Sequence, residues 1–246
     1  MKGAIIGGTA FNGPLSVPCR KKVVETRYGK VLFYEQIDAE EPMLFLPRHG
    51  DASNRVPPHL VNYKANIEAL RQEGVAQVIA LYAVGSISSL ILPGCYGLID
   101  QFIDFTGGGR DSTFFTGKEE PVRHIPMLEP YNKRLRTLLV KKAHEKGRNI
   151  SMKGTYICTN GPRLETPAEI RLFRKWGADV VGMTAATETI LANEAGIDIA
   201  GLAFSINWAA GLDAEGISFV EDEILARMMT EMLSISVDVL SIPVQS

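Results

Sequence analysis

The 246-residue sequence predicts one α/β domain spanning residues 1–246, with a central mixed, twisted β-sheet flanked by helices. Short apolar runs alternate with segments of helical periodicity along the whole chain. No linker, repeat or low-complexity segment divides them. Polar residues recur just past the ends of the predicted strands, where open α/β sheets bind their ligands. The fold class therefore also predicts where a site should lie.

The first half of the chain contributes most of the predicted strands. Apolar and β-branched runs predict strands at residues 3–6, 23–38 (a hairpin that turns at 28–29), 42–46, 75–83 and 96–105. Apolar residues at helical spacing, each series stopped by a glycine, predict helices at residues 57–73 and 135–146. The apolar window 75–94 is long enough to span a bilayer, but its glutamine, serines and proline indicate a buried strand, a polar turn and a second apolar piece.

The second half repeats the alternation after an apolar run at 156–158. Thr166 is a suitable N-cap, with Pro167 at the first helical position and Glu169 at the third, which is a capping box. The remaining predicted elements are helices at 168–176, 187–194 and 221–241 and strands at 180–183 and 199–205.

Composition excludes several classes of protein. The hydrophobic fraction of 46% and the charged fraction of 22% are typical of a soluble globular protein. The net charge is −2 and no long basic run occurs, so we expect no nucleic-acid partner. The three cysteines lack Cys-x-x-Cys spacing, which argues against a zinc site or a disulfide framework. These features predict a cytoplasmic protein that needs no membrane, metal or cofactor.

The segment 159–169 has the features of a ligand-binding loop. Asn160, Gly161 and Pro162 end the preceding apolar run, and the capped helix begins at Pro167. Glu165 therefore stands just outside a helix N-terminus, in a loop that is fixed at both ends. The alternative is a surface turn with a solvated glutamate.

Several strand ends present groups that bind anions. They are Thr9 on a Gly-Gly turn, Arg48 and His49, the turn from Ala83 to Ser86, and Thr184. An arginine fork, turn amides and hydroxyls together can surround a phosphate. Because neither the P-loop nor the dinucleotide fingerprint is present, a bound phosphate would be a free ion or a simple ester. Each of these groups alone is also common in ordinary turns.

A second set of groups suits a purine. Glu165 can accept a ring N–H, and Asn207 offers both a donor and an acceptor. Asn207 could instead only cap a strand end. The sequence has no Gly-x-Ser-x-Gly nucleophile elbow, and His49 and His59 are too far apart to share one helical face as metal ligands. Covalent and metal-dependent catalysis are therefore not supported.

Taken together, the motifs resemble those of trimeric purine nucleoside phosphorylases and 5'-methylthioadenosine phosphorylases. The resemblance covers nearly the whole chain, in the same order, through residues 7–9, 47–50, 61–66, 83–86, 161–166 and 182–184. It implies reversible cleavage of a nucleoside by inorganic phosphate, a co-substrate, to a free base and a pentose 1-phosphate. It also implies a homotrimer, with sites near the subunit interfaces.

The resemblance implies a role for each matching residue. Thr9, Arg48, His49, the Ala83 amide and Thr184 would hold phosphate. Met183 would lie against the ribose, and either Phe114 or Phe115 would reach the site of the neighbouring subunit, Phe115 being favoured. Glu165 and Asn207 would bind the purine. Asn207, Glu165 and His49 would be the catalytic residues.

Departures from the family patterns address substrate choice. Methylthioadenosine phosphorylases usually have an aspartate at the position of Asn207 and a serine at the position of Glu165. The Glu165 and Asn207 pair instead resembles the purine-binding residues of 6-oxopurine phosphorylases. Inosine and guanosine phosphorylases commonly place a histidine near the 5'-hydroxyl, but no histidine follows residue 144. Ile217 and Val220 could instead form an apolar pocket for a 5'-methylthio group. Tyr82 and Ala10 also depart from residues that are common at their positions in the phosphate site.

This combination is similar to bacterial 5'-methylthioinosine phosphorylases, which would release hypoxanthine and 5-methylthioribose 1-phosphate in purine salvage. Two enzyme alternatives are a methylthioadenosine phosphorylase, which would release adenine, and a general inosine and guanosine phosphorylase. An alternative of another class is a nucleoside-binding protein without turnover.

Overall fold

The computed structural model describes residues 1–8, 17–51, 55–118, 120–213 and 216–243. The strands of this part form one mixed sheet in the order β2-β3-β4-β1-β5-β9-β8-β7, with β10 paired to β5 and β6 paired to β10. The strands are β1 (Lys2–Gly7), β2 (Cys19–Thr26), β3 (Gly29–Gln36), β4 (Leu44–Pro47), β5 (Val75–Ser86), β6 (Tyr96–Ile99), β7 (Gln101–Phe105), β8 (Thr155–Thr159), β9 (Val180–Gly182) and β10 (Asp198–Trp208). The predicted α/β class with a mixed sheet is confirmed.

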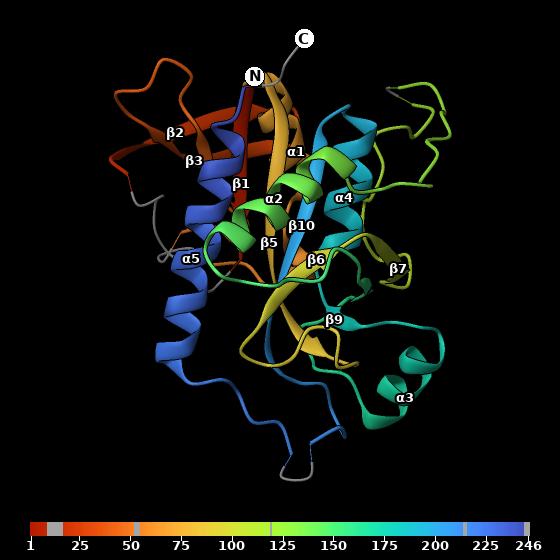
Figure 1. The fold of residues 1–246 in the computed structure, drawn as a ribbon. Coiled ribbons are helices and arrows are strands. Elements are labelled where there is room, and N and C mark those ends of the chain that lie inside the picture. Colours follow the sequence, from red (N-terminus) through yellow and green to blue (C-terminus); the bar gives the residue numbers. More distant parts are fainter. Residues whose placement is uncertain (9–16, 52–54, 119, 214–215, 244–246) are drawn as a thin grey trace.

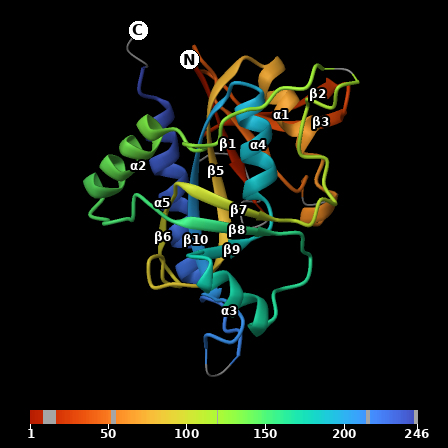
Figure 2. The same cartoon turned by 90° about the vertical axis from the view of Figure 1, so that its right-hand side faces the viewer.

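Helices cover both faces of the sheet. Figure 2 shows α1 (Tyr63–Gln72) and α4 (Ala185–Glu194) on one side of it, and α2 (Lys133–Glu145) and α5 (Asp222–Leu240) on the other. One apolar core cluster lies under α1 and α4, and a second lies under α2 and α5. The short helix α3 (Pro167–Lys175) stands apart, where it packs on β8 and β9 through Ile170 and Phe173.

Strand β5 is the centre of the sheet. It pairs in parallel with β1 and β10, and its last residues pair antiparallel with β9. Because both of its faces are covered, Val78 to Leu81 form a continuous buried apolar run, as is typical of a central parallel strand. The parallel strands β1, β4, β5 and β10 end at one edge of the sheet, at Gly7, Pro47, Ser86 and Trp208. This edge positions the site.

The apolar window 75–94 forms β5 and an irregular connection to β6, as the sequence predicts. Ser86 is fully buried where the strand ends, and its hydroxyl contacts the carbonyl of Ile91 and the hydroxyl of Ser205. None of the helices in the described ranges combines the length and apolar character that a membrane span requires.

Two predicted elements prove to be divided. The helix expected at 57–73 is a 3-10 turn (η1, Pro58–Leu60) followed by α1. The division occurs because the Asn62 side chain accepts a hydrogen bond from the Ala65 amide and so caps a new helix. The strand expected at 96–105 is likewise β6 and β7, which pair with β10 and β8 respectively. Asp100 separates them and accepts a hydrogen bond from the Gly154 amide.

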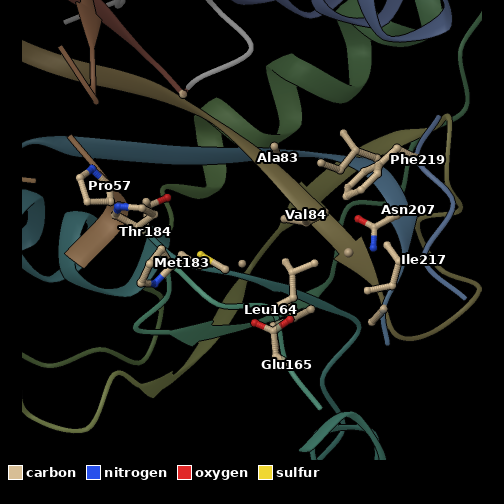
Figure 3. Close-up of a pocket in the computed structure, with 18 of the residues that line it drawn as sticks. Pro57, Ala83, Val84, Leu164, Glu165, Met183, Thr184, Asn207, Ile217 and Phe219 are labelled. Carbon is tan, nitrogen blue, oxygen red and sulfur yellow. The ribbon is translucent and has the colours of Figure 1, made fainter. Parts of the chain in front are cut away.

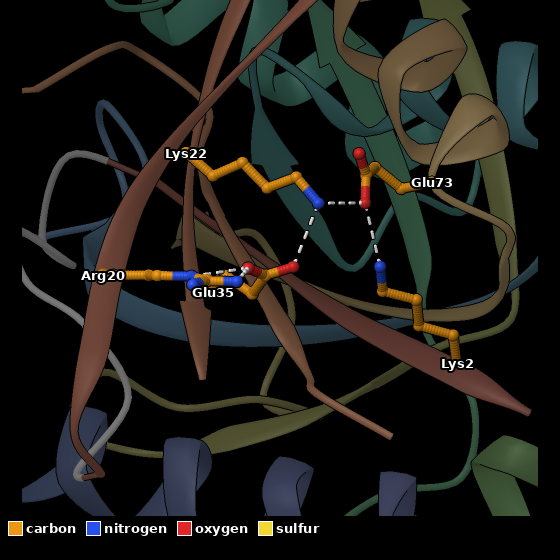
Figure 4. Close-up of polar contacts among 5 residues, drawn as sticks. All are labelled: Lys2, Arg20, Lys22, Glu35 and Glu73. Atoms are coloured by element: carbon orange, nitrogen blue, oxygen red, sulfur yellow. Dashed lines mark hydrogen bonds and ion pairs between the residues drawn. The ribbon is translucent and has the colours of Figure 1, made fainter. Parts of the chain in front are cut away.

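An ion-pair network joins the β2–β3 hairpin to the rest of the sheet (Figure 4). Lys22 Nζ lies 3.0 Å from Glu35 Oε1 and 2.6 Å from Glu73 Oε2, just after α1. Arg20 contacts Glu35 at 2.7 Å, and Lys2 on β1 contacts Glu73 at 2.9 Å. The Glu35 side chain is almost buried, so this network is a structural device rather than a solvated surface pair.

Candidate active site

A cavity of about 290 Å³ opens at the edge where the parallel strands end. Its walls come from the last residues of β5, β9 and β10 and from segments that follow strands (Figure 3). It is lined by Gly8, Arg48, His49, Val56, Pro57, Pro58, Ala83, Val84, Gly85, Pro162, Leu164, Glu165, Val181, Gly182, Met183, Thr184, Ile206, Asn207, Ala209, Ala210, Ile217 and Phe219. An apolar cavity with a few convergent polar groups is the usual form of a small-molecule site.

Arg48 is fixed by a buried carboxylate. Its Nε and Nη2 atoms each donate to Glu188 on α4 at 2.8 Å, and Nη1 donates to the Leu81 carbonyl at 3.1 Å. Both charged side chains are 1% exposed. Burial alone would lower the pKa of Arg48, but Glu188 outweighs it and keeps the guanidinium charged. Among the described residues, one N–H on each terminal nitrogen has no acceptor and can serve a ligand in the cavity.

His49 is a neutral imidazole with a defined tautomer. Its Nδ1 lies 2.9 Å from the Val56 carbonyl, which can only accept, so Nδ1 carries the proton and Nε2 is an acceptor. Burial, followed by the charge of Arg48, lowers the pKa of His49 to about 4. At neutral pH the ring can therefore receive a hydrogen bond from a protonated ligand oxygen.

The N-terminus of α4 adds an anion-binding feature to the same end of the cavity. Thr184 is the N-cap of α4 and lines the cavity, and its hydroxyl makes no capping bond. A helix N-terminus favours an anion through its free amides and its dipole. Ala83 and Gly8 line the wall nearby, and a Cβ on Gly8 would approach Arg48 Nη1 to 3.1 Å. Thr9, predicted to hold phosphate, and Ala10 lie outside the described residues.

Glu165 occupies the position that the sequence predicts, between β8 and a capped helix. Thr166 accepts from the Glu169 amide and the Glu169 side chain accepts from the Thr166 amide, so the predicted capping box is present. The Glu165 side chain lines the cavity and accepts a hydrogen bond from Thr159 Oγ1 at 2.8 Å. Burial raises the pKa of Glu165.

Asn207 is turned toward the cavity by a β-bulge. The register of β10 against β5 shifts between Ser205 and Asn207, and this adds one residue at Ile206. Asn207 is 7% exposed, and its Nδ2 donates to the Trp208 carbonyl at 2.6 Å. Its Oδ1 and second N–H have no protein partner within the described chain, so they can serve a ligand.

Figure 3 shows how the polar groups are distributed. Thr184 and Pro57 lie at one end of the view, and Asn207 lies at the other end beside Ile217 and Phe219. Glu165 projects between them from the wall opposite Ala83. The anion-binding end and Asn207 therefore lie at opposite ends of the cavity in this view.

Apolar side chains form the rest of the walls. Met183 lines the cavity against Gly161, whose backbone has φ of 66° and where a Cβ would overlap the Met183 sulfur. Leu164 and Ile217 are 47% and 37% exposed although both line the cavity. Partly exposed apolar residues at a cavity mouth are typical of a binding surface for a flat, apolar ligand face.

Two predicted substrate-binding residues lie elsewhere. Val220 is not among the lining residues, because its backbone bonds to Ile206 and its side chain packs in the core cluster under α5; Phe219 lines the wall instead. Of the aromatic pair, Phe114 is buried and tilted against Tyr28 of its own chain at 5.6 Å. Phe115 is half-buried under Arg123, so it is the better placed of the two to reach a neighbour.

The sequence did not reveal Glu188, Leu164 or the Pro57–Pro58 wall. Glu188 lies in α4, which is buried on most sides, with Ala185, Ala186 and Leu191 among its buried residues. A buried acidic residue in such a helix indicates that a buried basic partner exists. Leu164 had no comparable signal, because an apolar residue in a loop is common on protein surfaces.

Comparisons with known proteins identify the family of this chain. The model of the phosphorylase superfamily matches residues 2–240. A 6-oxopurine nucleoside phosphorylase of Pyrococcus furiosus is 41% identical over 223 residues, which cover 89% of this chain and 83% of the relative. A probable S-methyl-5'-thioinosine phosphorylase of Thermodesulfovibrio yellowstonii is 40% identical over 217 residues, which cover 86% of this chain and 79% of the relative.

A solved structure supports the same assignment. Methylthioadenosine phosphorylase from Schistosoma mansoni, in complex with adenine, superimposes with a TM-score of 0.86 at 29% identity, covering 96% of this chain and 91% of that one. The chain therefore belongs to the phosphorylase superfamily. Within that family it is an enzyme, a purine nucleoside phosphorylase. The alternative of a binding protein without turnover is set aside.

Proposed function

We propose that this enzyme cleaves 6-oxopurine nucleosides with inorganic phosphate and that S-methyl-5'-thioinosine is its preferred substrate. The observation that carries the proposal is the pair Glu165 and Asn207, which face one cavity whose remaining walls are largely apolar. The names of relatives at about 40% identity, 6-oxopurine nucleoside phosphorylase and S-methyl-5'-thioinosine phosphorylase, support it.

Phosphate binds at the end of the cavity formed by Arg48, His49, Thr184 and the Ala83 backbone. The two free N–H groups of Arg48 and the N-terminus of α4 attract the dianion. The O–H of HPO₄²⁻ donates a hydrogen bond to His49 Nε2. This nitrogen is an acceptor because Nδ1 carries the ring proton and donates to the Val56 carbonyl. Thr9, which the family resemblance assigns to phosphate, would complete this set.

The purine binds at the other end. The Glu165 carboxylate accepts the N1–H of hypoxanthine, and the Asn207 amide donates to N7 or O6. Leu164 and Met183 give the base and the ribose an apolar surface. Adenine lacks an N1–H, so an ionised Glu165 would face a lone pair, and such a mismatch rejects a substrate strongly.

Catalysis needs no covalent intermediate. The C1'–N9 bond breaks with its electron pair going to the purine, and a phosphate oxygen forms the new bond to C1'. In the net reaction the proton that the new phosphate ester gives up is balanced by the proton that the purine anion takes up. The sugar gains positive charge beside the phosphate dianion, while the purine gains negative charge beside the Asn207 N–H. Positioning and electrostatic stabilisation therefore account for the rate.

The 5' substituent meets an apolar wall. Ile217 and Phe219 lie beside Asn207, and Val56, Pro57 and Pro58 also line the cavity. Contact with these side chains removes apolar surface from water, which favours a methylthio group over a hydroxyl. Val220 does not line the cavity, so it would contact the substrate only if the 5' substituent extended beyond Phe219.

We further propose a homotrimer in which Phe115 completes the site of the neighbouring subunit. Its half-buried position on the segment that follows β7 supports this. Light scattering that gives the mass of a monomer would contradict the trimer. The same experiment repeated with Phe115→Ala separates assembly from activity, since we expect an unchanged mass and a raised KM for the nucleoside.

A methylthioadenosine phosphorylase is the second candidate. Burial raises the pKa of Glu165, and a protonated Glu165 would donate to N1 of adenine. The structural neighbour that binds adenine also supports this reading.

The decisive test of function is turnover with product identification. Purified enzyme is incubated with methylthioinosine with and without phosphate, and the products are followed by chromatography and ³¹P NMR. We expect hypoxanthine and a pentose 1-phosphate only when phosphate is present. Hypoxanthine without phosphate would indicate a hydrolase, and the absence of any product would contradict the proposed substrate.

A further inference from the structure

Arg110 does not line the cavity, but it hydrogen-bonds to Thr159 and Asn160, where the loop that carries Glu165 begins. It follows three glycines after β7, of which Gly107 and Gly108 adopt φ of 72° and 70°. This left-handed backbone is easy only for glycine and turns the chain back toward the end of β8. Arg110 is not a lining residue of the cavity.

All five N–H donors of Arg110 have protein acceptors. Nε donates to Asn160 Oδ1 at 3.0 Å, and Nη2 donates to the carbonyls of Asn160 at 2.8 Å and Thr159 at 3.3 Å. Nη1 donates to Tyr63 Oη at 3.3 Å and to Thr187 Oγ1 at 3.5 Å. These acceptors are all uncharged, so the guanidinium serves as a fork that fixes geometry.

The clamped segment leads directly to Glu165. Thr159, whose carbonyl Arg110 holds, donates its own hydroxyl to Glu165 Oε1 at 2.8 Å. Asn160, held by both its carbonyl and its side chain, begins the loop that carries Glu165 to the capped helix α3. Arg110 thus determines where β8 ends and how Thr159 is oriented.

Arg110 also hydrogen-bonds to Tyr63, which in turn contacts another cavity-lining residue, Pro58. Tyr63 accepts from Arg110 and donates to the Pro58 carbonyl at 2.9 Å, and its ring lies 5.3 Å from the guanidinium carbon. Pro58 lines the same cavity as Glu165. Arg110 therefore links two walls of the site without contacting a ligand.

We propose that Arg110 is a positioning residue that sets the Glu165 carboxylate for recognition of the purine, through Thr159 and Asn160. This inference rests on the proposed function for the meaning of Glu165. Lysine cannot replace the arginine, because a single ammonium cannot occupy the planar fork between Asn160 and the Thr159 carbonyl.

The test is a double-mutant cycle between Arg110 and Glu165. We expect Arg110→Ala and Arg110→Lys to lower kcat/KM for methylthioinosine by about 10- to 100-fold, mainly through KM for the nucleoside. KM for phosphate should change by less than about twofold. In a Glu165→Ala background, either Arg110 substitution should add little further loss, because the two residues act in series.

Two controls separate positioning from general stability. Guanidinium ion added at millimolar concentration should restore part of the activity of Arg110→Ala but none of Glu165→Ala. Arg136→Ala, which removes an arginine that donates to the Met152 carbonyl far from the cavity, should leave both KM values unchanged. Should Arg110→Ala not fold, Arg110→Lys carries the same cycle.

Equal losses from Arg110→Lys with and without Glu165 would overturn the inference, and so would a raised KM for phosphate with an unchanged KM for the nucleoside. Wild-type turnover distinguishes the two proposals. If the wild type gives no phosphate-dependent hypoxanthine, the proposed function fails. If the wild type is active and Arg110 variants match it, only the role of Arg110 fails.

Discussion

The guanidinium of Arg48 and the carboxylate of Glu188 form a buried two-bond pair, with each N–O distance at 2.8 Å. The residues are 140 positions apart in the sequence and join the end of β4 to α4. Breaking a buried pair leaves an uncompensated charge and is strongly destabilising. The pair fixes the Arg48 guanidinium in the cavity wall, and under the proposed function this preorganises it for phosphate.

We therefore expect Arg48→Lys to raise KM for phosphate by about tenfold or more, although the charge is kept. A lysine cannot bond Glu188, the Leu81 carbonyl and a phosphate at once in the arginine geometry. Steady-state kinetics with varied phosphate measure this. Arg134→Lys, at an arginine that bonds Gln77 away from the cavity, is the matched control and should behave like the wild type. An unchanged KM for phosphate in Arg48→Lys would refute the assigned role.

The lowered pKa of His49 predicts that the folded protein loses stability in acid. Its folded pKa of about 4 lies below that of an exposed histidine, so the unfolded chain takes up a proton first as the pH falls from about 6.5. Stability should therefore decrease between about pH 6.5 and 4, by on the order of 3 kcal/mol from this residue. Urea unfolding of wild type and His49→Gln across this range measures it. Parallel curves for the two proteins would show that His49 is not the cause.

We expect the buried Glu165 carboxylate to lower the stability of the folded protein at neutral pH while it contributes to purine binding. Its pKa is raised mainly by burial, so the stability that the protonated carboxyl provides is lost as the pH rises through its folded pKa. Glu165→Gln keeps an acceptor for Thr159 without the buried charge. We expect a higher Tm at pH 7 and a fall in kcat/KM of about tenfold for a 6-oxopurine nucleoside, since a hydrogen bond to a charged group is lost.

Glu169, on the same loop, provides the opposite control. Its hydrogen bonds with Arg163, and then with the Thr166 amide, lower its pKa to about 2. Its contribution is therefore present above about pH 4.5 and lost as the pH falls toward 2. Glu169→Gln should lower Tm at pH 7 and leave the base preference unchanged. A Tm shift of the same sign in both variants would contradict the assignment for Glu165.

Asn207 should determine which purine is accepted. Asn207→Asp replaces the donor with an acceptor, which suits an exocyclic amino group and a protonated N7 rather than O6. We expect the ratio of kcat/KM for methylthioadenosine to that for methylthioinosine to rise by about tenfold or more. Unchanged preference in this variant would exclude Asn207 as a purine-binding residue.

Much of the fold could be predicted from the sequence because its signals are local. The capping box of Thr166 and Glu169 and the glycines that end α1 and α2 act within a few residues, and the structure has them where expected. The predictions failed where a local signal competed with a longer pattern. Asn62 interrupts an apolar periodicity that continues through it, and Asp100 divides a run whose two parts choose different partner strands.

Site residues that follow or end strands could be predicted from the sequence. Residues whose role depends on a partner distant in sequence could not. Arg48, Glu165 and Asn207 all follow or end strands, so their convergence follows from the topology. Glu188 and Arg110 act only through residues distant in sequence, and no short motif indicates such partners. Phe219 lines the cavity where Val220 was expected, because the bridge between Asn207 and Phe219 sets the register of that segment.

The central claim, a 6-oxopurine reader beside an apolar 5' wall, is tested most directly by competition. Methylthioinosine, inosine and methylthioadenosine at equal concentration are given to the enzyme with phosphate in one vessel, and the loss of each is followed by chromatography. The relative rates equal the ratios of kcat/KM. We expect methylthioinosine to be consumed first, with hypoxanthine as its base. Faster loss of methylthioadenosine would contradict the assignment of Glu165 and Asn207, and faster loss of inosine would contradict the apolar 5' wall.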